Sequence, residues 1–281
     1  MRPDLRVAAV ACVLVLATGC SSMSRKFTFM RPDVSRKGVT QVAPDYDIRG
    51  EGNRRTANMA ASERLMLANA RLRAGEYDQA EAEARAALKQ DPKSSDAHTV
   101  LALVAGARGQ DAQAGPHYAK AAELAPRSGI AANNYGAWLC GNGRAAESLA
   151  WFDRALADPA YGSPASARAN AGSCALQAGD PVRAERDLRA ALQATPDNPT
   201  ALAAMAQLEF SMGRYLQARA FSERRLAAAP ANADVLRLAS RIEDKLGDTT
   251  AAARYMQQAS SQGAGGGSPA AAAQNANGGR P

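Results

Sequence analysis

Residues 102–126 read ALVAGARGQDAQAGPHYAKAAELAP, and this order of residues decides the fold. A small residue, Ala102, stands seven positions before Gly109, a second small residue, Ala114, stands five positions after it, and Pro126 closes the stretch. Equivalent glycines recur at Gly75, Gly109, Gly143, Gly179, Gly213 and Gly247. Their spacing of 34, 34, 36, 34 and 34 residues is too regular for chance and predicts six copies of one structural unit.

Each unit is predicted to be two antiparallel helices joined by a turn. The glycine ends the first helix, because it adopts the left-handed conformation of a helix cap without steric cost. Small residues on both sides of the glycine let the two helix axes approach closely. A proline ends the second helix in most units, since it cannot continue the hydrogen-bond ladder. The larger side chains expected to fill the core are Leu67, Leu88, Leu101, Tyr118, Tyr135, Phe152, Leu156, Leu188, Leu192, Met205 and Leu226.

One pair of helices cannot bury its apolar face alone, so the six units are expected to stack into one continuous core. The two extra residues between the third and fourth units lie near Tyr161–Pro164 and lengthen that loop. The predicted repeat domain covers residues 57–262. The polar segment before it has no sustained period and is predicted to be a flexible tether, residues 20–56. The Gly- and Ala-rich tail, residues 263–281, is predicted to be disordered.

The first twenty residues predict export and a lipid anchor. A positively charged start precedes an apolar run at residues 7–16, which suits a signal core and is too short to span a bilayer. The run ends in LATGC at residues 16–20, which resembles the lipobox of bacterial lipoproteins. The resemblance implies that residues 1–19 are removed, that Cys20 is acylated and that the outer membrane is the destination, because no Asp follows Cys20. The alternative is an ordinary cleavable signal with an incidental cysteine.

Composition and motifs argue against catalysis and cofactors. The net charge of +7 is interleaved with acids and aromatics make up only 5% of the chain, so nucleic-acid binding is not indicated. The two histidines, His98 and His117, stand singly on predicted helices without further residues at metal-ligand spacing. No Gly-x-Ser-x-Gly elbow or phosphate loop occurs. We therefore expect a non-enzymatic protein with no metal or other cofactor and no small-molecule substrate.

The repeat unit resembles the tetratricopeptide repeat, which implies an all-α, right-handed superhelical solenoid. A more specific resemblance lies in the middle of the chain. Residues 133–140 read NNYGAWLC, residues 158–161 read DPAY and residues 170–176 read NAGSCAL. These runs resemble the type IV pilus biogenesis and stability lipoproteins of the PilF/PilW family. The resemblance is fairly specific, because the general repeat does not demand their Asn and Cys residues.

The family resemblance implies a role as a pilotin. Such a protein would be anchored in the outer membrane, face the periplasm and bind the subunit of the pilus secretin, promoting its localisation or assembly. The alternative from another class is an adaptor lipoprotein that recruits periplasmic cell-wall hydrolases or proteases. Helical repeats alone do not separate these two functions.

Three asparagines are the candidate partner-binding residues. Asn134 and Asn170 occupy equivalent places in consecutive repeats, and Asn133 precedes the first of them. In the repeat class this place faces the groove, where an amide can both donate to and accept from an extended peptide backbone. The equal alternative is that each asparagine bonds a neighbouring backbone and holds its own helices together.

Cys140 and Cys174 form the candidate disulfide. Both lie late in the first helices of adjacent repeats, and an oxidising periplasm would allow them to pair. The alternative is two free cysteines that act as small buried apolar residues.

Overall fold

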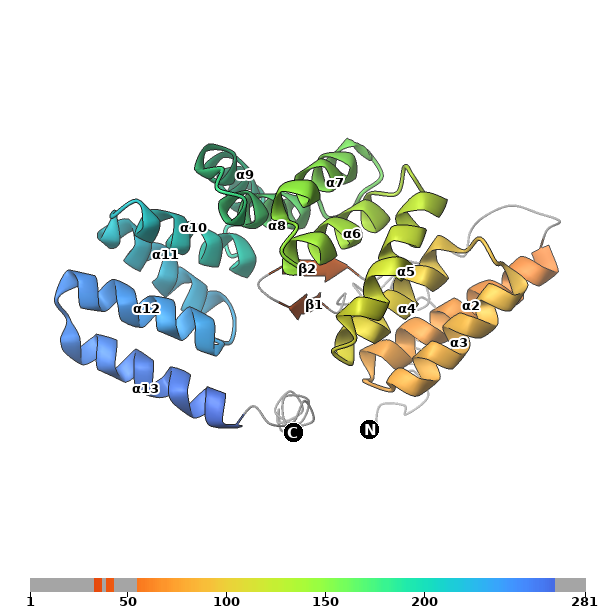
Figure 1. Cartoon of the computed structure of the whole chain (residues 1–281), viewed down its shortest axis with the longest axis horizontal. Coiled ribbons are helices and arrows are strands. Elements are labelled where there is room, and N and C mark those ends of the chain that lie inside the picture. Colours follow the sequence, from red (N-terminus) through yellow and green to blue (C-terminus); the bar gives the residue numbers. More distant parts are fainter. Residues whose placement is uncertain (1–32, 37–38, 43–54, 266–281) are drawn as a thin grey trace, which may run out of the picture. The chain divides into compact units, whose positions relative to one another are not determined.

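The computed structural model describes residues 33–36, 39–42 and 55–265, which form one two-stranded hairpin and twelve helices (Figure 1). The strands are β1 (Asp33–Arg36) and β2 (Val39–Val42). The helices are α2 (Arg55–Arg73), α3 (Tyr77–Gln90), α4 (Ser95–Ala107), α5 (Asp111–Leu124), α6 (Gly129–Gly141), α7 (Ala145–Ala157), α8 (Pro164–Gln177), α9 (Pro181–Ala194), α10 (Pro199–Ser211), α11 (Tyr215–Ala228), α12 (Ala233–Leu246) and α13 (Thr249–Gly265).

Successive helices pack as the six pairs α2/α3, α4/α5, α6/α7, α8/α9, α10/α11 and α12/α13. Each pair then packs on the next one along the chain. The first helices of neighbouring pairs also contact one another, so α2, α4, α6, α8, α10 and α12 form one continuous row. This arrangement confirms the predicted all-α solenoid of six helix-turn-helix repeats.

The turns within the repeats follow the predicted chemistry. All six spaced glycines have a positive φ, between 72° and 85°. At Gly143, the Gly143 N–H donates to the Cys140 carbonyl and the Arg144 N–H donates to the Leu139 carbonyl. This pair of bonds is the Schellman cap, and its left-handed residue favours glycine. A side chain there would be strained even though open space surrounds it.

Small residues lie where the two helices of a repeat cross. A Cβ built on Gly172 of α8 would lie 2.5 Å from Leu188 Cγ of α9. A Cβ built on Gly136 of α6 would lie 3.1 Å from the Phe152 ring of α7. Larger residues at these positions would push the helix axes apart, as the sequence predicted.

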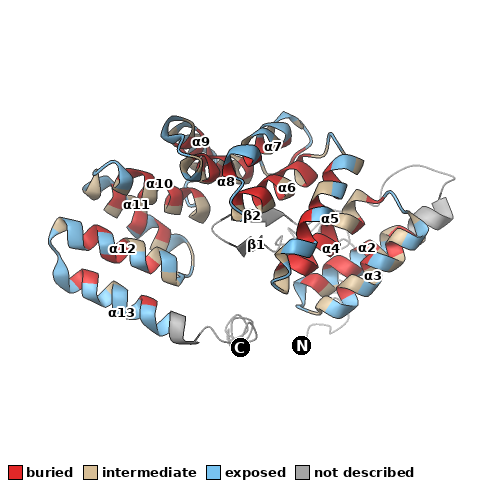
Figure 2. Ribbon diagram, in the orientation of Figure 1, coloured by how far each residue is buried: buried red, intermediate tan, exposed pale blue. Residues whose placement is uncertain are grey.

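Burial is concentrated on the faces where helices meet (Figure 2). Most of the predicted large core residues are buried or partly buried. Tyr118 and Phe152 are among the largest fully buried side chains. The prediction was wrong for Leu67, which is 40% exposed. Among the described elements, α3 and α4 make the main contacts with α2, so part of this first helix stays open to solvent.

Three features differ from the domain boundaries predicted by the sequence. The hairpin of β1 and β2 lies inside the predicted tether, and α2 begins at Arg55, two residues before the predicted domain. The last helix ends at Gly265, three residues beyond the predicted end. The signal segment, Cys20 and most of the predicted tail lie outside the described residues. Within the described part, no helix has both the length and the apolar character needed to cross a bilayer.

Candidate partner-binding site

The candidate site is built on α6 and α8, the first helices of the third and fourth repeats. Ser128 caps α6, because its hydroxyl oxygen accepts a hydrogen bond from the Ala131 N–H. Pro164 begins α8, where its missing N–H costs nothing and its fixed φ suits a helix start. Both helices are rich in alanine and glycine and are buried on most sides. Two closely packed helices therefore form the base of the site.

The three predicted asparagines come together in the interior. Asn133, Asn134 and Asn170 are each 0% exposed. Asn170 of α8 donates from Nδ2 to Oδ1 of Asn133 at 3.0 Å, and Asn133 Nδ2 lies 3.4 Å from Oδ1 of Asn134. The amides thus link two neighbouring repeats through their side chains. Recognition of a partner by the same amides stays a prediction.

Cys140 of α6 and Cys174 of α8 are joined in a disulfide, with their Cα atoms 5.8 Å apart. Both cysteines are buried. Of the two alternatives that the sequence left open, the structure therefore shows the disulfide. The amide link and the disulfide join the same two helices at two levels, so α6 and α8 are held in a fixed relative position.

The lengthened loop between α7 and α8 makes a third connection to α6. Asp158 accepts a hydrogen bond from the Gly129 N–H at 2.8 Å through one carboxylate oxygen and from the Ala160 N–H at 2.9 Å through the other. The side chain of Tyr161 is buried and packs directly over Gly129, where a Cβ would lie 2.6 Å from that of the tyrosine. The two extra residues therefore seat this loop on the start of α6, which sequence spacing alone did not predict.

Aromatic residues support the far side of α6. Tyr135 stacks on Trp138 with ring centroids 6.1 Å apart and meets Trp151 of α7 edge-on at 4.7 Å. The Trp138 indole N–H donates to the Asp111 carbonyl of α5 at 3.1 Å. Gly115 of α5 gives the Trp138 ring its space, since a Cβ there would lie 2.2 Å from it. These aromatic residues belong to the contacts between α6 and the second helices α5 and α7.

The hairpin lies on α6 and α8. Strand β2 contacts both helices, while β1 pairs with β2 (Figure 1). The two helices that carry the asparagines and the disulfide therefore also hold an extended segment of the same chain. Sequence patterns do not predict this contact, because the hairpin is short and stands far from the third repeat along the chain.

The histidines that appear isolated in the sequence form a pair. His98 of α4 and His117 of α5 approach with their Nδ1 atoms 3.0 Å apart. Burial lowers the pKa of His98 below its ordinary value, and the nearby His117 and Lys120 lower it further. Burial also lowers the pKa of His117, with Arg85 adding to the effect and Glu81 opposing it. In the described part of the chain, no three His, Cys, Asp or Glu residues are grouped to hold a metal ion.

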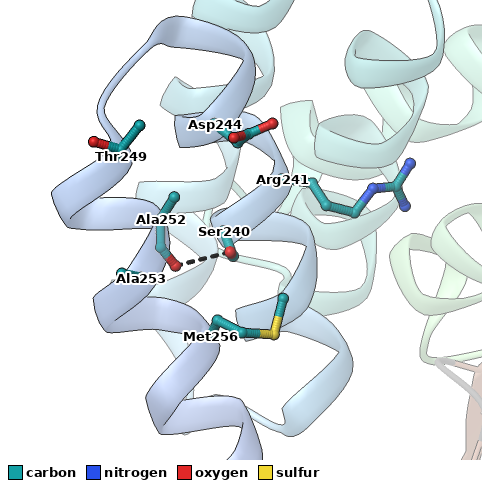
Figure 3. Close-up of a pocket in the computed structure, with 7 residues that line it drawn as sticks. All are labelled: Ser240, Arg241, Asp244, Thr249, Ala252, Ala253 and Met256. Atoms are coloured by element: carbon teal, nitrogen blue, oxygen red, sulfur yellow. Dashed lines mark hydrogen bonds between the residues drawn. The ribbon is translucent and has the colours of Figure 1, made fainter.

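An open hollow of about 400 Å³ lies between α12 and α13 (Figure 3). Its inner wall is closed by a hydrogen bond from the Ser240 hydroxyl to the Ala252 carbonyl at 2.8 Å. The Arg241 side chain points away from α13, and its guanidinium carbon lies 4.5 Å from the centroid of the Phe210 ring. The cationic group of the lining is thus directed elsewhere, and we do not treat the hollow as a candidate site.

Comparisons with known proteins identify the tetratricopeptide repeat and point to relatives. Sequence models of the tetratricopeptide repeat match residues 65–129, 139–199 and 175–242. The type IV pilus assembly protein PilF of Pseudomonas aeruginosa is 29% identical over 184 residues, which cover 66% of this chain and 73% of PilF.

The solved structures of PilW and PilF are similar to this chain in fold and sequence. The crystal structure of PilW, described as a widely conserved type IV pilus biogenesis factor, is 33% identical with a TM-score of 0.65. That match covers 74% of this chain and 93% of the PilW chain in the crystal. The structure of Pseudomonas aeruginosa PilF is 28% identical with a TM-score of 0.63, and the match covers 72% of this chain and 91% of the chain in that structure.

Proposed function

Because the chain belongs to the family of tetratricopeptide-repeat proteins that includes PilF and PilW, we propose that it acts in type IV pilus biogenesis as a pilotin. In this role it binds the subunit of the pilus secretin, the outer-membrane channel of the pilus. It thereby promotes localisation or assembly of the secretin at the outer membrane. The protein works by binding another protein and performs no chemical step.

One observation carries the proposal: identity of 33% with PilW across 93% of the crystallised PilW chain, together with a shared fold. The row of first helices supports it, because stacked repeats present an extended surface suited to protein partners. Within that row, α6 and α8 are fixed to each other by the Asn133–Asn170 bond and the disulfide. A binding surface whose parts are already in position loses less conformational freedom when a partner docks.

The anchor is the second part of the proposal. Acylation of Cys20 would hold the protein on the outer membrane, with the repeats facing the periplasm where secretin subunits arrive. A pilotin needs both functions at once, since binding without an anchor would leave the subunits away from their membrane.

Deletion of the gene tests the proposal. We expect secretin subunits to be found away from the outer membrane, few heat-resistant secretin multimers, and loss of surface pili and of twitching motility. The intact gene should restore all of these, whereas a copy with Cys20→Ser should not. Normal secretin multimers in the deletion strain would refute the pilotin role and favour an adaptor for cell-wall hydrolases or proteases.

A direct binding measurement complements the genetics. Protein pulled down from detergent-solubilised outer membranes should carry the secretin, and purified secretin subunit should bind the purified protein. Recovery of cell-wall hydrolases without secretin would contradict the proposal.

A further inference from the structure

The hairpin offers a starting point, because it lies on the helices that carry the candidate binding residues. β1 and β2 pair antiparallel, with Arg36 opposite Val39 and Asp33 opposite Val42. β2 contacts α6 and α8, and β1 lies on the other side of β2 in the two-stranded order. An extended strand thus already lies on the two helices where the sequence predicted an extended peptide from a partner.

The chemistry of the strand matches that of the helices beneath it. In an antiparallel pair, alternate residues turn their backbone N–H and C=O groups away from the partner strand. β2 therefore directs a row of backbone donors and acceptors away from β1, as any extended peptide would. Asparagine amides both donate and accept, and three of them are placed on α6 and α8.

The packing around α6 indicates which element can leave. The described elements in contact with α6 are α4, α5, α7, α8 and β2. The four helices belong to the repeat stack, and their shared core residues and the Cys140–Cys174 disulfide fix them. β2 lies outside the repeats. Its departure would expose part of α6 and α8 without breaking any helical pair.

We propose that strand β2 is a built-in occupant of the partner groove, and that an extended segment of the protein partner replaces it on binding. This inference rests on the proposed function only for the identity of the partner. Because the strand is tethered to the repeats, its effective concentration at the groove is on the order of millimolar. Only molecules in which the strand is undocked can bind a partner segment. The apparent association constant is therefore the intrinsic one multiplied by the undocked fraction.

The first experiment tests the occupant without the secretin. A fluorescent synthetic peptide with the sequence DVSRKGVTQV, residues 33–42, is titrated into the detergent-solubilised full-length protein. The test variant carries Val39→Pro and Gln41→Pro, which removes two backbone donors and disrupts strand pairing. The control carries Val39→Ala and Gln41→Ala, which keeps both backbone N–H groups.

We expect the peptide to bind the proline variant at least tenfold more tightly than the wild-type protein, in which the groove is occupied. The alanine control should lie close to the wild type. Far-UV circular dichroism should be the same for all three, because both substitutions precede α2. Absence of peptide binding to the proline variant, or equal binding to all three proteins, would overturn the proposal.

The second experiment uses purified secretin subunit with the same three proteins. Removal of the internal competitor should tighten binding to the proline variant by at least threefold relative to the alanine control. Unchanged or weaker binding to the proline variant would overturn the displacement. If the peptide binds the proline variant but the secretin subunit binds none of the proteins, the proposed function fails while the internal occupant stands.

Discussion

Asn170 of α8 donates a hydrogen bond to Asn133 of α6 across 37 residues of sequence, and neither side chain is exposed to solvent. Asn170→Ala would leave the Asn133 carbonyl oxygen without this donor in the interior. We expect the free energy of unfolding to fall by about 1–3 kcal/mol. Thermal denaturation followed by circular dichroism measures this. As a control, Asn142→Ala removes an exposed amide bond to the Trp138 carbonyl and should have a much smaller effect.

The groove prediction has its own test in the double variant Asn134→Ala with Asn170→Ala. If the amides bond a partner's backbone, binding of the secretin subunit should weaken more than tenfold, which corresponds to about 1.4 kcal/mol or more. Helical content should be unchanged. A variant that melts much earlier and binds as before at low temperature would leave the asparagines with a structural role alone.

Removal of the disulfide should destabilise the middle repeats. Cys140→Ala with Cys174→Ala opens a loop of 34 residues, for which the chain-entropy relation gives about 3–4 kcal/mol. The wild-type protein in reductant should melt close to the temperature of the double variant without reductant. Intact mass spectrometry of the unreduced protein should find no free thiol at either position. Two free thiols there, or a melting temperature insensitive to reductant, would contradict the bonded state.

Two glycines in first helices should respond oppositely to alanine. At Gly172 the new Cβ would clash with Leu188, so we expect Gly172→Ala to lower the free energy of unfolding by about 1–3 kcal/mol. At Gly106 nothing lies within 4 Å of the new Cβ, so Gly106→Ala should raise it by about 0.5–1 kcal/mol through helix propensity. Urea denaturation of the two variants separates packing from propensity. Equal effects of the same sign would refute the crossing-point argument.

The histidine pair predicts a dependence of stability on pH. His98 and His117 both have a folded-state pKa below the ordinary value of 6.5, chiefly because of burial. The unfolded chain therefore binds more protons as the pH falls below about 6.5, and the free energy of unfolding should decrease there. Urea denaturation at pH 7.5 and pH 5.5 measures the change. His98→Gln with His117→Gln should reduce it, and an unaltered pH dependence in that variant would argue against the pair as its source.

The lipid anchor is tested by Cys20→Ser. This change should abolish metabolic labelling with a fatty acid and release the protein from outer-membrane fractions. Cys20→Ala should behave identically, because neither residue has a thiol to acylate. Labelling that persists in these variants would show that another position carries the lipid.

The sequence predicted the repeats well because their signals are local and periodic. Gly143 needs a positive φ and Gly172 needs a close neighbour, and each constraint recurs with the repeat. The contacts of the candidate site are not periodic. The Asn133–Asn170 bond depends on how two repeats are rotated against each other, and the docking of β2 joins segments distant in sequence. Side-chain types at these positions indicated the place but not the partner atoms.

The connections that hold the third and fourth repeats also bear on mechanical load. Each repeat contacts chiefly its neighbours, so tension between the membrane anchor and a bound channel would be transmitted along the stack one repeat at a time. Among the described helices, only α6 and α8 are joined by a disulfide. Under such tension the first two repeats, which lie between the anchor and the proposed binding site, would separate before the disulfide-linked third and fourth repeats.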